Sequence, residues 1–210
     1  MSKVITTPKG KAVWPRIDTP DTKFDEDGVY SCKLHVSEGD FKAFEAIVKP
    51  KLDAAYKEEC SRQGKDKIRM AASSPLRIND EGDHEIYAKQ KAKVHTKSKG
   101  TLEFTIAAVD SQGKKITEPD EEGKEVAFVP KIGSGSTLKM AVEINTWFVP
   151  SQGFGYTLRL RAVQIFDLIE YGGGSNFGFG AEADGYVGSG ESLNQAFEVA
   201  DEAETSNAPF

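Results

Sequence analysis

The 210-residue chain is 38% hydrophobic and 29% charged, enough for one well-packed domain with an extension or at most two small domains. No apolar run approaches the roughly 18–20 residues of a membrane span, and residues 1–7 lack the start of a secretory signal. We therefore expect neither a membrane protein nor a secreted one. Cys32 and Cys60 stand alone, which argues against a disulfide framework and against a zinc site.

The net charge of -6 is unevenly distributed. Residues 181–210 contain seven acidic residues and no Lys or Arg, so the rest of the chain holds 27 basic against 26 acidic groups. A near-neutral body beside an acidic tail is typical of nucleic-acid-binding proteins with an interaction tail. A tail that only confers solubility fits the composition equally well.

In chain order, Trp14 before Pro15 is expected to pack at a strand end. Residues 28–36 alternate as a half-buried strand should, with Tyr30, Cys32 and Leu34 inward. Residues 37–40 offer capping oxygens and negative charge, which predicts a helix over 37–60 that contains Pro50. Its apolar residues recur at helical spacing: Phe41, Phe44, Ile47, Val48, Leu52 and Tyr56.

The strand pattern resumes after a polar stretch. Turn chemistry at 110–114, an acidic loop at 118–125 and a Gly/Ser loop at 133–136 separate the later segments. Short strands without alternating helices indicate a mainly β sandwich or small barrel. The expected strands are 85–94, 102–110, 138–149 and 156–171.

The body is thus expected to end near residue 170. Residues 171–190 include eight glycines and no aliphatic periodicity, which predicts a flexible linker. Residues 191–210 form the acidic tail, predicted to be disordered.

The segment 87–99 (YAKQKAKVHTKSK) is the most informative. As an extended strand it places Tyr87, His95 and five lysines on one face, with same-face residues roughly 6.6–6.8 Å apart. A row of ammonium groups at that spacing can follow one nucleic-acid backbone. A lysine-decorated edge that prevents sheet aggregation is the alternative.

Aromatic and basic side chains on the outward faces of 138–149 and 156–171 complete a groove for stacking bases and holding phosphates. For Trp147, core packing remains an alternative. The predicted DNA-binding residues are Tyr87, Lys89, Lys91, Lys93, Lys97, Lys99, Lys139, Trp147, Arg159 and Arg161.

Enzymatic patterns are weak. Residues 133–139 resemble a phosphate loop only superficially, and the three histidines form no metal-binding motif. We predict no enzyme activity, no cofactor and no metal site. A metal-dependent nuclease, a protein that binds duplex DNA as well, and an adaptor that does not bind DNA stay open as alternatives.

The C-terminus predicts protein docking. Phe210 would insert into an apolar pocket of a partner while neighbouring acidic groups meet a basic rim. The same charge would compete with DNA for the lysine row. The predicted docking residues are Glu198, Asp201, Glu202, Glu204 and Phe210.

Several motifs resemble those of single-stranded-DNA-binding proteins from tailed phages of the T-odd podovirus type: 28–30 (GVY), 109–115 (VDSQGKK), 129–139 (VPKIGSGSTLK), 171–174 (YGGG) and 185–190 (GYVGSG). The resemblance implies an OB-fold body, a five-stranded β-barrel with one inserted helix. It also implies sequence-independent binding and annealing of single-stranded DNA in replication and recombination.

The same resemblance implies tail contacts to the replicative polymerase and helicase-primase, action in the cytoplasm of the infected bacterial host, and a possible homodimer. The tail is less densely acidic than in that family. Its Ala-Pro-Phe ending is similar to the Pro-Phe ending of bacterial single-stranded-DNA-binding proteins. The identity of the tail's partner therefore stays open.

Overall fold

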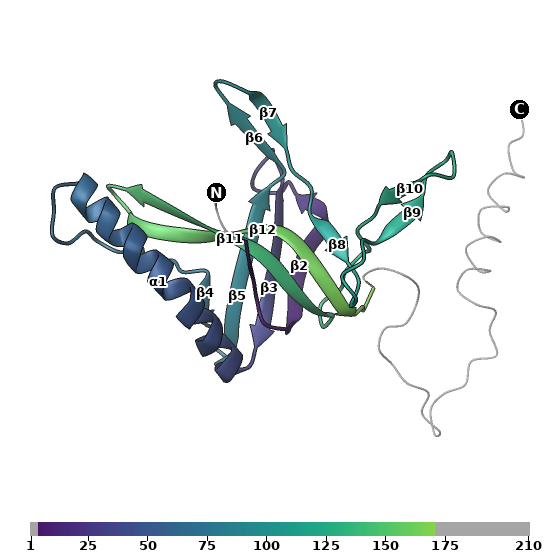
Figure 1. Cartoon of the computed structure of the whole chain (residues 1–210), viewed down its shortest axis with the longest axis horizontal. Helices are drawn as coiled ribbons and strands as arrows, with labels where there is room; N and C mark the ends of the chain where they lie inside the picture. Colours follow the sequence, from purple (N-terminus) through teal and green to yellow (C-terminus); the bar gives the residue numbers. More distant parts are fainter. Residues whose placement is uncertain (1–3, 171–210) are drawn as a thin grey trace, which may run out of the picture. The chain divides into compact units, whose positions relative to one another are not determined.

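The computed structural model describes residues 4–170 and is mainly β with one long helix (Figure 1). The predicted linker 171–190 and tail 191–210, including the five docking residues, lie outside the described residues. The elements are β1 (Ile5–Thr6), β2 (Gly10–Asp21), β3 (Val29–Val36), α1 (Glu38–Arg62), β4 (Leu76–Ile78), β5 (His84–Lys91), β6 (Lys93–Thr96), β7 (Gly100–Glu103), β8 (Ala107–Val109), β9 (Thr117–Pro119), β10 (Glu125–Ala127), β11 (Thr137–Val149) and β12 (Gly153–Asp167).

Five strands close into a ring. The main sheet has the order β1-β11-β2-β3-β5-β12-β8, and an additional β11–β12 pairing joins β11 to β12. The ring β2-β3-β5-β12-β11 is the barrel, with β5 and β12 parallel and the other neighbours antiparallel. The predicted small barrel is confirmed, and its five-stranded form is that of an OB fold.

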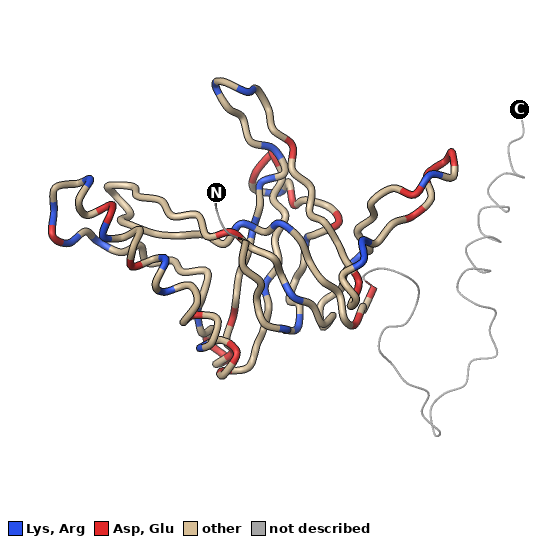
Figure 2. Tube along the Cα trace, in the orientation of Figure 1, with Lys and Arg blue, Asp and Glu red and all other residues tan. Residues whose placement is uncertain are grey.

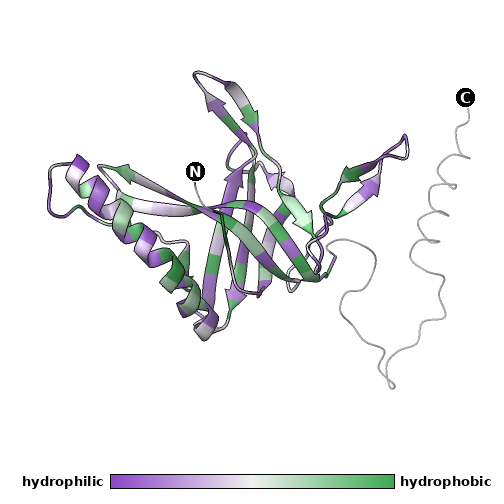
Figure 3. Ribbon diagram, in the orientation of Figure 1, coloured by the Kyte–Doolittle hydropathy of each residue, from purple (hydrophilic) through white to green (hydrophobic). Residues whose placement is uncertain are grey.

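Apolar and polar residues alternate along the barrel strands, as Figure 3 shows. The inward set is almost completely buried and includes Leu34, Ile86, Leu138, Leu158 and Leu160. Because successive side chains of a strand point to opposite faces, this alternation leaves the odd-numbered residues of β3, β5 and β11 on the outer surface.

Helix α1 begins after Ser37, whose hydroxyl accepts a hydrogen bond from the Asp40 backbone N–H at 3.1 Å. Phe41, Phe44 and Val48 are buried as predicted, whereas Ile47 is exposed, because only one stripe of the helix packs on the barrel. A second small core of Cys60, Ile68 and Phe154 joins the end of α1 to the tip of the β11–β12 hairpin.

Four predicted segments need correction. The strands expected at 85–94 and 102–110 are each two strands, because the chain leaves the main sheet after Lys91 and returns at Ala107. The acidic loop 118–125 belongs to a hairpin, β9–β10, whose turn is closed by Asp120. β12 ends at Asp167, short of the predicted residue 171.

Two hairpins project from the barrel (Figure 1). We call residues 93–103, which contain β6 and β7, the basic arm, and residues 117–127, which contain β9 and β10, the acidic arm. Each is a separate two-stranded sheet. Figure 2 shows Lys residues near the tip of the first and Asp and Glu residues near the tip of the second.

Candidate nucleic-acid interface

Cations from three strands line up across the outer surface of the barrel. Arg159 of β12 pairs in register with Lys89 of β5, Lys89 with Ser31 of β3, and Ser31 with Arg16 of β2. The three cationic residues are exposed. Because these residues are register partners on neighbouring strands, the transverse row (Arg16, Ser31, Lys89, Arg159) runs across the strands. Neighbouring strands lie about 4.8 Å apart.

A hollow of about 400 Å³ opens beside the row, where Tyr87, Lys89 and Trp147 share its lining with Arg77 and Tyr156. Tyr87 is half-buried, and this burial raises the pKa of its hydroxyl, which stays protonated at neutral pH. The hollow thus brings together Tyr87, Lys89 and Trp147, which the sequence predicted to act together.

Trp147 is half-buried on the outer face of β11. It pairs in register with Gly155 of β12, where an added Cβ would come within 2.3 Å of the indole ring. The glycine therefore leaves the space that the ring occupies. Trp147 also lines a second hollow, with Phe148 and the end of α1.

The lysine row of residues 87–99 does not form one continuous strand, contrary to the prediction. Odd-numbered residues do point outward, but β5 ends at Lys91, Ala92 is buried, and β6 continues in the basic arm. The Ala92 backbone N–H donates to Gly28 O at 2.8 Å and its carbonyl accepts from Phe104 N–H at 2.7 Å, which fixes this break.

Carboxylates of the protein pair with the middle of the row. Lys91 Nζ lies 2.8 Å from Asp25 Oδ2 and 3.6 Å from Asp27 Oδ2. Lys93 lies 3.9 Å from a Glu103 oxygen, and His95 lies 2.7 Å from Asp27. A hydrogen bond to Asp25 raises the pKa of Lys91, whose charge is thus already compensated.

Lys97 and Lys99 are exposed in the β6–β7 turn, separate from the transverse row. Lys139 lies on β11, with Nζ 5.8 Å from the centre of the Phe166 ring. Arg161 is the extra residue of a β-bulge in β12, and its guanidinium donates to Glu143 at 2.7 Å. Of the two predicted arginines, Arg159 thus presents the more open charge.

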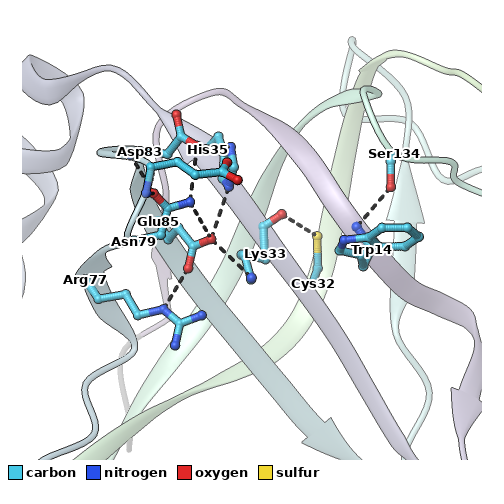
Figure 4. A network of polar contacts seen from close by, with 10 residues as sticks. Trp14, Cys32, Lys33, His35, Arg77, Asn79, Asp83, Glu85 and Ser134 are labelled. Carbon is cyan, nitrogen blue, oxygen red and sulfur yellow. Dashed lines mark hydrogen bonds and ion pairs between the residues drawn. The ribbon is translucent and has the colours of Figure 1, made fainter.

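A buried carboxylate fixes the cations at one end of the face (Figure 4). Glu85 is 2% exposed and accepts from Arg77 Nε at 2.7 Å, while Lys33 Nζ and His35 Nε2 each lie 3.1 Å from its Oε1. Burial by itself would raise the pKa of Glu85, but the hydrogen bonds from Arg77, Lys33 and His35 outweigh burial and lower it to about 2.

Sequence reasoning missed two exposed aromatic residues. Trp14 was expected to pack at a strand end, but it lies inside β2 and is 74% exposed, because a β-bulge turns it outward. Phe24, 88% exposed, lies in the loop between β2 and β3. The Trp14-Pro15 pair inside an otherwise alternating segment was the available signal.

No family model matches the chain. The single-stranded DNA-binding protein of Escherichia phage T7 is 32% identical over 96 residues, which cover 45% of this chain and 37% of that relative. The match therefore spans little more than a third of the relative's length.

The structural likeness is broader. The crystal structure of the single-stranded DNA-binding protein encoded by bacteriophage T7 superposes with a TM-score of 0.66 at 23% identity, covering 90% of this chain and 100% of that one. The single-stranded DNA-binding protein of bacteriophage Enc34 in complex with ssDNA gives 0.55 at 15% identity, covering 81% and 89%. The fold is that of phage single-stranded DNA-binding proteins.

The predicted resemblance to this group of phage proteins is confirmed in sequence over those 96 residues and in fold over most of the chain. In chain order, β3 and β5 are the second and third strands of the five-stranded ring. OB folds bind oligonucleotides on the face that these two strands form. Lys33, Tyr87 and Lys89 all lie there.

Within residues 4–170, His, Cys, Asp and Glu side chains form no group of three or more that is placed to hold a metal ion. In that part of the chain, no helix is both long enough and apolar enough to cross a membrane.

Proposed function

We propose that this protein binds single-stranded DNA without sequence preference across the β2-β3-β5-β12 face of its barrel. The transverse row beside Tyr87 and Trp147 carries the proposal. Cations of the row would contact phosphates, and the aromatic rings would stack on bases. Each stacked base contributes on the order of 1–3 kcal/mol whatever its identity, because every base has a π-face.

This path differs from the one suggested by the sequence. A backbone following β5 into the basic arm would meet Lys91 and Lys93, whose charges Asp25, Asp27 and Glu103 compensate. A backbone crossing the strands meets Lys89, Arg159 and Arg16, which make no ion pair within residues 4–170. Fewer opposing carboxylates favour the crossing path.

The comparisons support this function, since the proteins that share the fold are named for binding single-stranded DNA and one was solved with it. In this role the protein would act stoichiometrically in the cytoplasm of the infected host, coating and annealing strands during replication and recombination. The fold would serve as a binding surface, with no chemical step of its own.

The test is binding to oligo-dT over a range of salt concentrations. Log K is expected to fall by roughly 0.7 for each phosphate neutralised per unit of log salt. An affinity that stays flat between low and physiological salt overturns the proposal. Competition by a duplex of equal length measures strand preference, and no binding to either would favour an adaptor role.

Partner recruitment is a second part of the proposal and rests on sequence alone. The tail residues Glu198, Asp201, Glu202, Glu204 and Phe210 would dock on a replication protein, with the polymerase and helicase-primase as first candidates. Deleting residues 195–210 is expected to abolish partner capture and tighten DNA binding. Unchanged DNA affinity would remove the idea of competition, and unchanged partner capture would remove the docking role.

A further inference from the structure

Trp14 has an unusual backbone and a large exposed ring. Val13 pairs with Lys33 and Arg16 with Ser31, so Trp14 and Pro15 together lie opposite Cys32 in a bulge of β2. The φ angle of Trp14 is +48°, the left-handed region that side chains with a Cβ avoid. Among residues 4–170, Trp14 is the one non-glycine residue with positive φ.

A distant loop holds this bulge in place. Trp14 N–H donates to Ser134 Oγ at 3.0 Å, as Figure 4 shows. Two residues earlier in β2, Ala12 N–H donates to Ser136 O and Ala12 O accepts from Gly135 N–H, both at 2.8 Å. Gly135 has φ +91°, which favours glycine. The Gly/Ser loop 133–136 therefore clamps β2 on both sides of Val13.

A strained backbone that fixes an exposed ring calls for a reason in function. An exposed tryptophan contributes little to the core, and the left-handed conformation opposes folding, yet the clamp maintains both. We propose that Trp14 is a second base-stacking surface and that the 133–136 loop positions it. This inference rests on the proposed function and extends its site to the first barrel strand.

The register sets the direction of the extended site. Val13, next to Trp14, lies across from Lys33, which lies across from Tyr87. From β2 to β12 are three strand spacings, about 14 Å in all. A DNA strand on the transverse row therefore has Trp14 at one end and the hollow with Tyr87 and Trp147 at the other. Dinucleotides are too short to reach both ends at once.

Fluorescence separates the two ends, because Trp14 and Trp147 are the two tryptophans of the chain. In the Trp147→Phe protein all tryptophan emission comes from Trp14, and in Trp14→Phe it comes from Trp147. Oligo-dT of about ten nucleotides is expected to quench Trp14 in the first protein with the same midpoint as binding measured by anisotropy of labelled DNA.

The outcomes distinguish this inference from the function on which it rests. If labelled DNA binds the Trp147→Phe protein while Trp14 emission stays unchanged, Trp14 does not stack and the inference is wrong, although DNA binding stands. If neither protein binds labelled DNA and neither changes its emission, the proposed function itself fails. Quenching of Trp14 together with binding supports both.

A comparison of Trp14→Gly, Trp14→Ala and Trp14→Phe tests the strained backbone. Glycine accepts φ +48° without the penalty that alanine carries, so Trp14→Gly is expected to unfold at a higher urea concentration than Trp14→Ala. Both should bind oligo-dT about five- to 150-fold more weakly than the wild type, the equivalent of one stacked base, and Trp14→Phe should retain most of the affinity. Full affinity in the folded glycine variant would overturn the inference.

Ser134 is the positioning residue of the clamp. Ser134→Ala removes the acceptor for Trp14 N–H, and in the Trp147→Phe background it is expected to lower the anisotropy of Trp14 emission and to weaken DNA binding severalfold. Ser134→Thr keeps the hydroxyl and should restore both. Unchanged anisotropy in a folded Ser134→Ala protein would show that the loop does not position the ring.

Discussion

The indole ring of Trp147 occupies the space above Gly155, where three ring atoms would lie within 2.8 Å of an added Cβ. Because β11 and β12 pair at this point, the indole ring itself must move to make room for an added Cβ. Gly155→Ala is therefore expected to lower the free energy of unfolding by about 1–3 kcal/mol through overpacking. Urea denaturation measures this change.

The same substitution displaces the ring, so Trp147 emission should shift in a Trp14→Phe background. Gly39→Ala is the matched control, because a Cβ on Gly39 meets nothing within 4 Å and the residue lies in the first turns of α1. The control should be neutral or stabilising. Equal effects of the two substitutions would contradict the contact between Trp147 and Gly155.

The lysines of β5 should differ in their importance for DNA binding. Lys89 lies in the transverse row, whereas Lys91 is paired with Asp25. Lys89→Ala and Arg159→Ala are each expected to weaken oligo-dT binding and to reduce the salt slope by about 0.7–1. Lys91→Ala should leave the slope close to that of the wild type. A larger effect at Lys91 than at Lys89 would contradict the crossing path and would favour a DNA backbone that follows β5.

Glu85 should make the stability of the barrel depend on pH. Its pKa in the folded protein, about 2, lies below the ordinary value of 4.5, so ionised Glu85 stabilises the folded state above that ordinary value. This contribution, on the order of 3 kcal/mol at pH 7, is lost as the pH falls through about 2. Glu85→Gln removes it at every pH.

Urea unfolding of the wild type and Glu85→Gln at pH 7, 4 and 3 measures the difference. The gap between the two proteins is expected to shrink as the pH falls. Asp53→Asn is a suitable control, since Asp53 is exposed on α1 and makes no ion pair within residues 4–170. A gap that stays constant with pH would mean that the charge of Glu85 does not stabilise the fold.

Cys32 should be unreactive in the native protein. Burial in the barrel raises the pKa of its thiol to about 12, so almost none is thiolate at neutral pH. In a Cys60→Ser protein, modification by a thiol reagent should require opening of the β2–β3 side and speed up with urea. Rapid modification in native buffer would show that this side of the barrel opens readily.

The long regular elements were predictable because their patterns reflect local geometry. Alternation identified β3 and β11, and helical spacing with a capping serine identified α1. Ile47 fits the same spacing but is exposed, since the pattern does not say how wide a stripe the barrel covers.

The point at which a segment changes its neighbouring strand was not predictable from the sequence. Alternation of buried and exposed residues continues from Tyr87 through Ala92 to His95, while the neighbouring strand changes from β3 to β7. Charge compensation is equally invisible, because Asp25 and Asp27 are far in sequence from the lysine and histidine that they contact. The basic side chains could be listed from the sequence, but their availability required the fold.

Trp14 shows the same limit at a single residue. Its backbone N–H donates to Ser134, which is 120 positions away. A tryptophan before a proline fits packing at a strand end as well as a bulge in a strand. The long-range hydrogen bonds of the 133–136 loop decide between the two.

The hydrogen bond from Phe104 N–H to Ala92 O closes the base of the basic arm. The residues between them take no part in the strand ring, and His95 of the arm contacts Asp27 of the loop between β2 and β3. The length and charge of the arm can therefore change without a change in the strands that close the barrel. A chain in which a short turn replaces residues 93–103 is therefore expected to retain the transverse row and with it the proposed DNA-binding face.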